Sequence, residues 1–220
     1  MKRLAMLVLA CTALALPARS EEEAPPPAAG EIPAGDYALD KSHATLVFRL
    51  SHLGFSLYTA EFRDFDASLT FDPADPAAAA VEATVDAASL DLPHPPEGFA
   101  DTIKGPEWLD TAQYPEITFR STAVEPTGGN DARITGDLTL HGVTRPVTLD
   151  ATFNGGWAGH PMDPHARIGF SATGTFSRSD FGVSYGVPAP GSSMGVGDTV
   201  EVTIQAEFTG PPLAPAPATP

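Results

Sequence analysis

Residues 200–208 read VEVTIQAEF, and this stretch decides the fold class because apolar and polar side chains alternate in it without a break. Strict alternation is typical of a half-buried antiparallel strand, in which successive side chains point to opposite faces. The same period of two recurs in residues 134–140, 147–153 and 168–176. The sequence therefore predicts a fold built from antiparallel strands.

Eight segments share this character and are the expected main strands: 44–50, 58–71, 81–87, 117–124, 132–140, 147–154, 166–176 and 200–208. Turn signals rich in Gly, Pro, Asn and Asp separate most of them. Residues 97–113 lack the alternation, and their prolines and spaced apolar side chains favour one or two short helices. An all-β fold is therefore expected: an eight-stranded antiparallel barrel with a short helical insertion near one mouth. Eight strands enclose just enough space for one small ligand.

The first residues have the character of a processing segment. Residues 1–20 combine the basic Lys2 and Arg3 with an apolar run and with small residues before Glu21, which predicts a secretory signal peptide. Cys11 lies inside this run, and lipidation at that residue is an open alternative. We therefore expect the protein in the periplasm or outside the cell.

Pro-rich and Ala-rich segments border the predicted barrel. Residues 21–35, which also contain Glu, are expected to be a disordered linker, and residues 211–220 a disordered tail, because such compositions bury little apolar surface. The barrel domain is then expected to span residues 36–210.

The charge of the chain is strongly acidic, with 12 Lys and Arg against 28 Asp and Glu and a net charge of −16. Loss of Lys2, Arg3 and Arg19 with the signal peptide would leave 9 basic against 28 acidic side chains, a net charge of −19. Such a surface repels nucleic acid and anionic membranes, so neither is an expected partner. No stable membrane insertion is expected either, since the apolar run near the start is too short for an ordinary transmembrane helix. A homodimer is compatible with the sequence.

Catalytic and metal-binding patterns are weak. Residues 191–195 match G-x-S-x-G, but that motif requires a strand before it and a helix and a histidine after it, whereas the last histidine is His165. His160, Asp163 and His165 offer metal ligands without a further ligand at a fixed spacing, so a solvated loop is favoured. We therefore expect no enzymatic activity, no catalytic residue, no metal site and no cofactor.

Apolar side chains on the inward phase of three strands are expected to line the barrel interior, and they are the candidate residues for contact with any ligand held there. These candidates are Leu46, Phe48, Ile168, Phe170, Phe176, Val202 and Ile204. Small residues share the inward faces, namely Gly136, Ala151, Ala172, Gly174 and Ala206. They have two interpretations that stay open: space for a ligand, or close backbone packing at barrel corners.

The sharpest local motif is RSDFG, which contains Arg178 and Asp180. Two residues apart on an extended segment, these side chains would share a face. The pair suggests either a salt bridge that orders the loop up to Gly197 or a charged rim that orients the head group of a ligand.

Five patches of the chain, taken in order, resemble the YceI-like family. They are DYALDKSHATLVFRLSHLGFS (36–56), EFRDFDASLTFDPADP (61–76), WLDTAQYPEITFRST (108–122), GDLTLHGVTRPVTL (136–149) and FSRSDFGVSYG (176–186). Members of that family are secreted, lipocalin-like β-barrels that hold an isoprenoid lipid. The resemblance implies an elongated barrel with an internal tunnel for a long isoprenoid chain, such as a polyprenyl phosphate or a quinone tail.

The same resemblance implies non-catalytic binding of that lipid, as a carrier or store in the cell envelope. The alternative is a structural or stress-related envelope barrel without a specific lipid ligand. Two features depart from the family pattern: Ala60 stands where glycine is usual, and the loop before Trp108 is unusually rich in proline.

Overall fold

The structure is a computed structural model that describes residues 32–159 and 163–212. The predicted signal peptide, residues 21–31 of the predicted linker and residues 213–220 of the predicted tail lie outside the described residues. The strands are β1 (Gly35–His52), β2 (Ser56–Phe62), β3 (Phe65–Phe71), β4 (Ala80–Asp86), β5 (Leu90–Asp91), β6 (Glu116–Gly128), β7 (Asp131–Leu140), β8 (Val143–Trp157), β9 (His165–Ser177) and β10 (Thr199–Pro212). The helical segments are the α-helix α1 (Phe99–Lys104) and the 3-10 turns η2 (Pro76–Ala78), η3 (Ala87–Ser89) and η4 (Arg178–Phe181).

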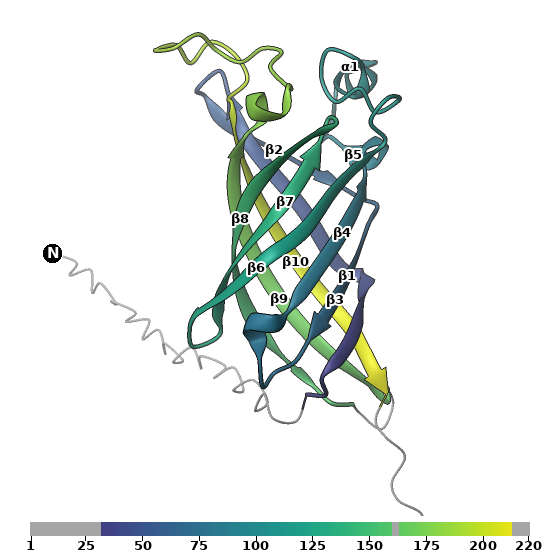
Figure 1. Ribbon diagram of the computed structural model, residues 1–220. Coiled ribbons are helices and arrows are strands. Elements are labelled where there is room, and N and C mark those ends of the chain that lie inside the picture. Colours follow the sequence, from purple (N-terminus) through teal and green to yellow (C-terminus); the bar gives the residue numbers. More distant parts are fainter. Residues whose placement is uncertain (1–31, 160–162, 213–220) are drawn as a thin grey trace, which may run out of the picture.

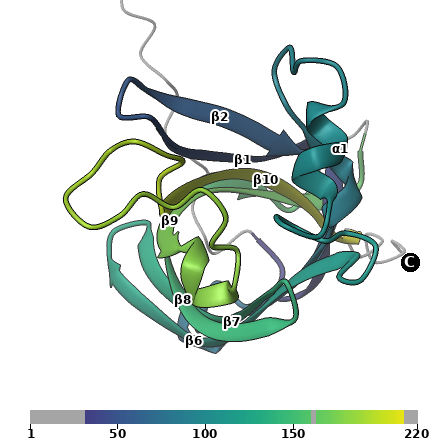
Figure 2. The same cartoon turned by 90° about the horizontal axis from the view of Figure 1, so that it is seen from above.

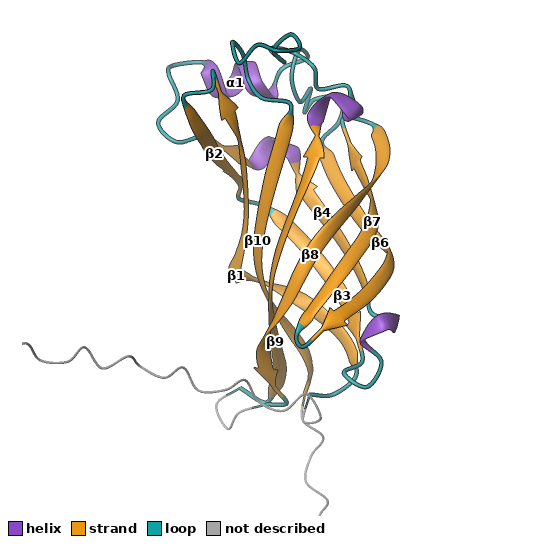
Figure 3. Cartoon of the chain, turned by 90° about the vertical axis from the view of Figure 1, so that its left-hand side faces the viewer, coloured by secondary structure: helices purple, strands orange, loops and turns teal. Residues whose placement is uncertain are grey.

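Eight of the strands close into an antiparallel barrel, which confirms the predicted fold class (Figure 1). Their order around the barrel is β10-β9-β8-β7-β6-β4-β3-β1, and β1 pairs with β10 to complete it. The short helix α1 lies above one end of the barrel, where the insertion was expected (Figures 1 and 3). Closure leaves the barrel strands without an open sheet edge along most of their length.

The prediction of one strand over residues 58–71 is wrong, because the structure divides it into β2 and β3. The reason lies in the neighbouring strand β1, where residues 40–43 have only Glu207 of β10 opposite them. Such a bulge bends a strand. The start of β1 consequently pairs with β3 and its end with β2, and β2 continues the sheet to β5 outside the ring of eight.

The end of the barrel near the described termini is solidly packed. Tyr37, Ile168 and Phe208 are each at most 5% exposed, and they belong to one apolar cluster. Ile32 joins this cluster with 3% of its surface exposed, although it falls inside the predicted linker. The packed region thus begins earlier than the predicted domain boundary, and at the other end β10 continues to Pro212. We call this region the closed end.

The opposite end of the barrel, the mouth end, carries four connections: the β1–β2 turn, the segment that contains α1, the β7–β8 turn, and the segment from η4 to β10 (Figure 2). Within the predicted helical stretch 97–113, α1 is the α-helix, and turns follow it. No helix among the described residues combines the length and hydropathy needed to cross a bilayer.

Candidate ligand-binding cavity

An internal cavity of about 770 Å³ lies inside the barrel. Side chains from all eight barrel strands line it, and nearly all of them are apolar. This follows from strand geometry, since every second side chain of an alternating strand points inward. Pockets that bind small molecules have volumes of about 300–1,000 Å³ and apolar walls with a few polar groups, so the cavity has the size and lining of a binding site.

The structure places six of the predicted apolar candidates on the cavity wall: Leu46, Phe48, Phe170, Phe176, Val202 and Ile204. Ile168 is not on the wall. It is 1% exposed in the cluster of the closed end, two residues nearer that end than Phe170. Ligand contact by the six wall residues stays a prediction.

Four phenylalanine rings line the cavity toward the closed end. Phe170 lies at ring-centroid distances of 5.5 Å from Phe153, 6.1 Å from Phe71 and 6.2 Å from Phe208. All four rings line the cavity, and they also pack in or against the cluster of the closed end. The rings therefore border the cluster of the closed end, and beside them the cavity lining continues to Pro76 of η2 and to residues 129–132 at the β6–β7 turn.

The small residues on the inward faces divide between the two interpretations. A Cβ atom at Gly136 would lie 2.6 Å from the carbonyl oxygen of Arg120, and one at Gly174 would lie 2.6 Å from a methyl group of Leu149. These glycines therefore permit close packing between strands. The alanines at 151, 172 and 206 instead line the cavity, where a larger side chain would reduce its volume.

Arg178 is the only fully buried polar or charged residue within 32–159 and 163–212, with 3% of its surface exposed. Its Nε atom donates to the carbonyl of Gly197 at 2.9 Å, and Nη2 donates to that of Val196 at 2.8 Å. Nη1 donates to the carbonyls of Val183 at 2.7 Å and Tyr185 at 2.9 Å. The guanidinium group thus holds the segment between η4 and β10 against the barrel.

The expected ion pair between Arg178 and Asp180 does not form, and this prediction is wrong. Residues 178–181 form a 3-10 turn rather than an extended strand, so side chains two residues apart do not share a face. Asp180 is exposed and lies outside the cavity. Asp198 instead orders the turn, since its carboxylate accepts hydrogen bonds from the backbone N–H of Ser179 at 2.9 Å and from its hydroxyl at 2.8 Å.

The positive charge of Arg178 lies at the cavity wall near the mouth end. Its hydrogen-bond partners in the described part of the chain are the four carbonyl oxygens, which occupy four of its five N–H donors. Burial lowers the pKa of this guanidinium, while nearby Asp198 acts in the opposite direction. The guanidinium carbon also lies 5.3 Å from the centre of the Trp108 ring. An anionic group that entered the mouth would meet a cation with one donor uncommitted.

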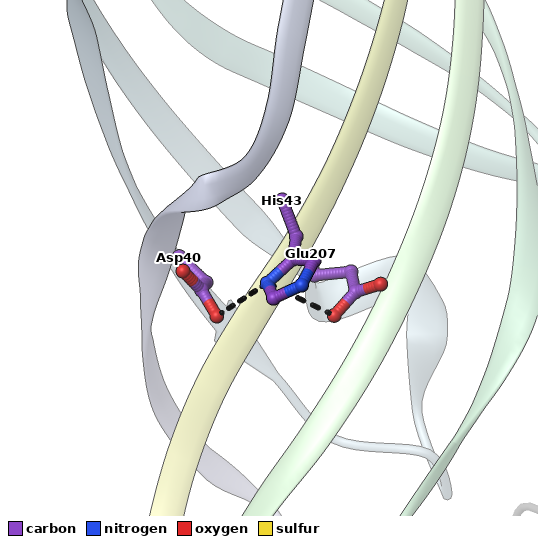
Figure 4. Close-up of side chains that lie close together, drawn as sticks. All are labelled: Asp40, His43 and Glu207. Atoms are coloured by element: carbon purple, nitrogen blue, oxygen red, sulfur yellow. Dashed lines mark hydrogen bonds and ion pairs between the residues drawn. The ribbon is translucent and has the colours of Figure 1, made fainter.

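A polar cluster on the outer wall, which sequence reasoning missed, contains Asp40, His43 and Glu207 (Figure 4). The bulge of β1 produces it: Asp40 accepts hydrogen bonds from the backbone N–H of Ser42 at 3.0 Å and from its hydroxyl at 2.6 Å. His43 Nδ1 lies 3.0 Å from the Asp40 carboxylate. The signal that could have found the cluster is the short polar run 40–43 within an otherwise alternating strand.

A cation already lies at this cluster. Arg167 Nη1 donates to the Asp40 carboxylate at 2.6 Å and lies 3.9 Å from that of Glu207. The hydrogen bonds from Ser42 and Arg167 hold the pKa of Asp40 far below its usual range. A divalent ion here would compete with the guanidinium group, so we regard the cluster as a cap of the bulge.

Among the weak metal-ligand candidates at 160, 163 and 165, Asp163 contacts Arg167. The carboxylate of Asp163 accepts a hydrogen bond from Arg167 Nε at 2.7 Å and lies 3.3 Å from His165 Nδ1. His160 lies outside the described residues. The absence of a metal site stays a prediction.

Comparisons with known proteins give a consistent result. The family model described as a YceI-like domain matches residues 37–208. A UPF0312 protein of Pseudomonas savastanoi pv. phaseolicola is 42% identical over 161 residues, which cover 70% of this chain and 80% of that protein. The crystal structure of Burkholderia cenocepacia BcnA matches with a TM-score of 0.66 at 28% identity, over 77% of this chain and 98% of BcnA.

A polyisoprenoid binding domain from Saccharophagus degradans, implicated in plant cell wall breakdown, matches with a TM-score of 0.58. The match covers 80% of this chain and 98% of that domain, and at 16% identity it concerns the fold alone.

Proposed function

The chain belongs to the YceI-like family, and from this premise we propose that it binds a long-chain isoprenoid lipid, such as a polyprenyl phosphate or a quinone, inside its barrel. In this proposal the protein is a non-catalytic carrier or store of that lipid in the cell envelope. The observation that carries the proposal is the apolar cavity of about 770 Å³. A solved barrel of the same fold is described as polyisoprenoid binding, which names a ligand class to test.

Energetics favour a long apolar ligand in such a cavity. Each buried methylene contributes about 0.8 kcal/mol, and association costs about 4–15 kcal/mol, so a tail of several isoprene units can outweigh that cost. An apolar tail requires no directional contacts, only a dry and continuous surface. The inward faces of the eight strands supply this surface from the four phenylalanine rings to the mouth end.

The head group is expected at the mouth end, near Arg178. A phosphate or a quinone carbonyl could accept the remaining N–H of its guanidinium, and a phosphate would also balance its charge. Arg178 already holds four backbone carbonyls in place, so its orientation is fixed before a ligand arrives. In this proposal Arg178 both orders the loop and orients the head group. Asp180 does not pair with it.

A binding role also agrees with the surroundings of the G-x-S-x-G match. Residues 191–195 lie in the connection between η4 and β10, and a strand rather than a helix follows them. The loop therefore lacks the strand-turn-helix arrangement on which a nucleophile elbow depends. The alternative function, a structural envelope barrel without a specific lipid, gives no reason for an apolar cavity of this size.

The test is organic extraction of protein purified from its native envelope under mild conditions, followed by mass spectrometry of the extract. We expect one isoprenoid species at a near-stoichiometric ratio to protein. An extract that contains only bulk phospholipids in variable amounts would support the structural alternative instead.

A further inference from the structure

Two segments at the mouth end contain no charged residue and no histidine. They are residues 53–60, which form the β1–β2 turn and the start of β2, and residues 185–197, which lead into β10. Charged residues make up 18% of the chain, so segments of this combined length would ordinarily carry about four of them. We call these two segments the uncharged lip.

Backbone hydrogen bonds join the two segments into one surface. The N–H of Leu53 donates to the carbonyl of Gly195 at 2.8 Å, and the N–H of Gly197 donates to the carbonyl of Ser51 at 2.7 Å. Arg178 ties the same surface to the barrel through the carbonyls of Tyr185 and Val196. Figure 2 shows the β1–β2 turn and the loop before β10 side by side at the mouth. The lip is therefore a single, anchored structure.

Large apolar side chains project from the lip into solvent. Phe55 is 80% exposed, Met194 70%, Leu57 54% and Tyr185 52%. Six large apolar side chains are exposed in the described residues; four belong to the lip, and the other two are Phe99 of α1 and Trp157 of β8. Exposed apolar surface concentrated at one place marks an interaction site.

The inner face of the lip is continuous with the cavity. Tyr58 and Val196 line the cavity, and so do Leu50 and His52 just before the turn. An apolar ligand could therefore move from the outer surface of the lip to the cavity wall without crossing a charged barrier.

We propose that the uncharged lip docks on the lipid surface of a membrane while the ligand passes between the bilayer and the cavity. The inference rests on the proposed lipid-binding function. A long isoprenoid tail leaves a bilayer for water at a cost of about 0.8 kcal/mol per methylene, so direct contact with the membrane removes a large barrier to exchange. Apolar and aromatic side chains insert favourably at the boundary between head groups and acyl chains.

The distribution of charge supports a membrane as the docking partner of the lip. A charged side chain at the lip would lose its hydration on insertion, and the lip has none. Exposed acidic side chains at the same end, Glu97, Asp101 and Glu107, belong to the α1 segment and would repel anionic lipids. The fit is to an uncharged lipid surface rather than to an anionic one.

The test compares two double variants that add the same charge at opposite ends of the barrel. Phe55→Asp with Met194→Asp alters the lip, whereas Ala74→Asp with Ala77→Asp alters exposed residues near η2 at the closed end. The full protein is titrated with quinone-free vesicles of phosphatidylcholine, and the bound fraction is measured by flotation. We expect the lip variant to lose about tenfold or more in partition coefficient and the control to stay within about twofold of wild type.

A third variant, Phe55→Ser with Met194→Ser, should show an intermediate loss because it removes apolar area without adding charge. Wild-type protein that does not float with the vesicles, or equal flotation of the lip variant and the control, would overturn the proposal and favour a protein partner for this surface. Lipid binding itself is measured separately, by loading the protein with a long-tailed quinone from detergent micelles, where no membrane is needed. The lip variant should load as fully as wild type, since its cavity is unchanged.

Discussion

The two ends of the barrel both bury apolar side chains, since Phe181 and Val183 at the mouth end are at most 3% exposed, yet most of the large apolar side chains that project into solvent lie at the mouth end. At the closed end, Tyr37 and Ile168 are at most 2% exposed, and the chain before β1 contributes Ile32 to the packing. At the mouth end, Phe55 and Met194 project into solvent above a cavity with apolar walls. The difference is one of exposed apolar surface at the mouth end, and the proposed exchange of a ligand takes place there.

Four phenylalanine rings pack where the cavity borders the cluster of the closed end, and a charge placed among them should have the largest effect. Phe170→Asp would put a carboxylate among three other rings, without a cationic partner. We expect a loss of about 3–5 kcal/mol in the free energy of unfolding, together with loss of bound lipid. Urea denaturation monitored by circular dichroism gives the stability. Phe170→Leu is the matched control, and a Phe170→Asp protein that keeps wild-type stability would contradict this packing.

The mouth end should depend on Arg178 nearly as strongly. Arg178→Ala removes the donors to four backbone carbonyls, so we expect a loss of about 2–4 kcal/mol in the free energy of unfolding. Asp180→Ala should change this free energy by less than about 0.5 kcal/mol, because Asp180 is exposed. Both values come from urea denaturation. A larger effect at Asp180 than at Arg178 would restore the ion-pair interpretation.

The same Arg178→Ala protein tests the head group. If the guanidinium binds it, mass spectrometry of extracted lipid should show a broader range of head groups with similar tails. If the guanidinium only anchors the loop, the lipid profile should match that of wild type.

The outer wall should show a smaller and pH-dependent effect at the bulge of β1. The pKa of Asp40 is held far below its usual range by Ser42 and Arg167, so its ionised form stabilises the fold. That contribution is complete above the ordinary carboxyl pKa and is lost as the pH falls from there through the lowered pKa of the folded state. Asp40→Asn should therefore cost about 1–2 kcal/mol at neutral pH and progressively less in acid.

Thermal denaturation at a series of pH values measures this effect. Asp137→Asn, at an exposed position of β7, is the control and should leave the pH dependence of wild type unchanged. If the stability loss of Asp40→Asn grew toward acid pH, ionised Asp40 would not be the cap of the β1 bulge.

The sequence predicted well whether a side chain points into or out of the barrel. It predicted less well how far along the barrel axis that side chain lies. Alternation placed Leu46 and Phe170 inside correctly, because period two follows directly from strand geometry. It assigned Ile168 to the cavity because the pattern does not reveal where the core closes. That position depends on packing by Ile32 and Tyr37, which are distant from Ile168 in sequence.

Local breaks in regular structure account for the remaining errors. The pairing of Arg178 with Asp180 assumed an extended segment, whereas a 3-10 turn separates the two side chains. The single strand over 58–71 assumed a regular β1, whereas the bulge of β1 divides its partner in two. The bulge depends on hydrogen bonds from Ser42 and Arg167 to Asp40, and the second of these spans a long stretch of sequence.

The central claim, that a lipid occupies the cavity, is tested most directly by native mass spectrometry on two neighbouring positions of β9. Ala172 lines the cavity and Thr173 faces outward, so Ala172→Asp and Thr173→Asp place the same charge on opposite sides of one strand. Circular dichroism first establishes that both proteins are folded. We predict that the wild type and Thr173→Asp carry one isoprenoid lipid per chain, whereas Ala172→Asp carries little or none. Equal lipid occupancy in the two folded variants would contradict the account.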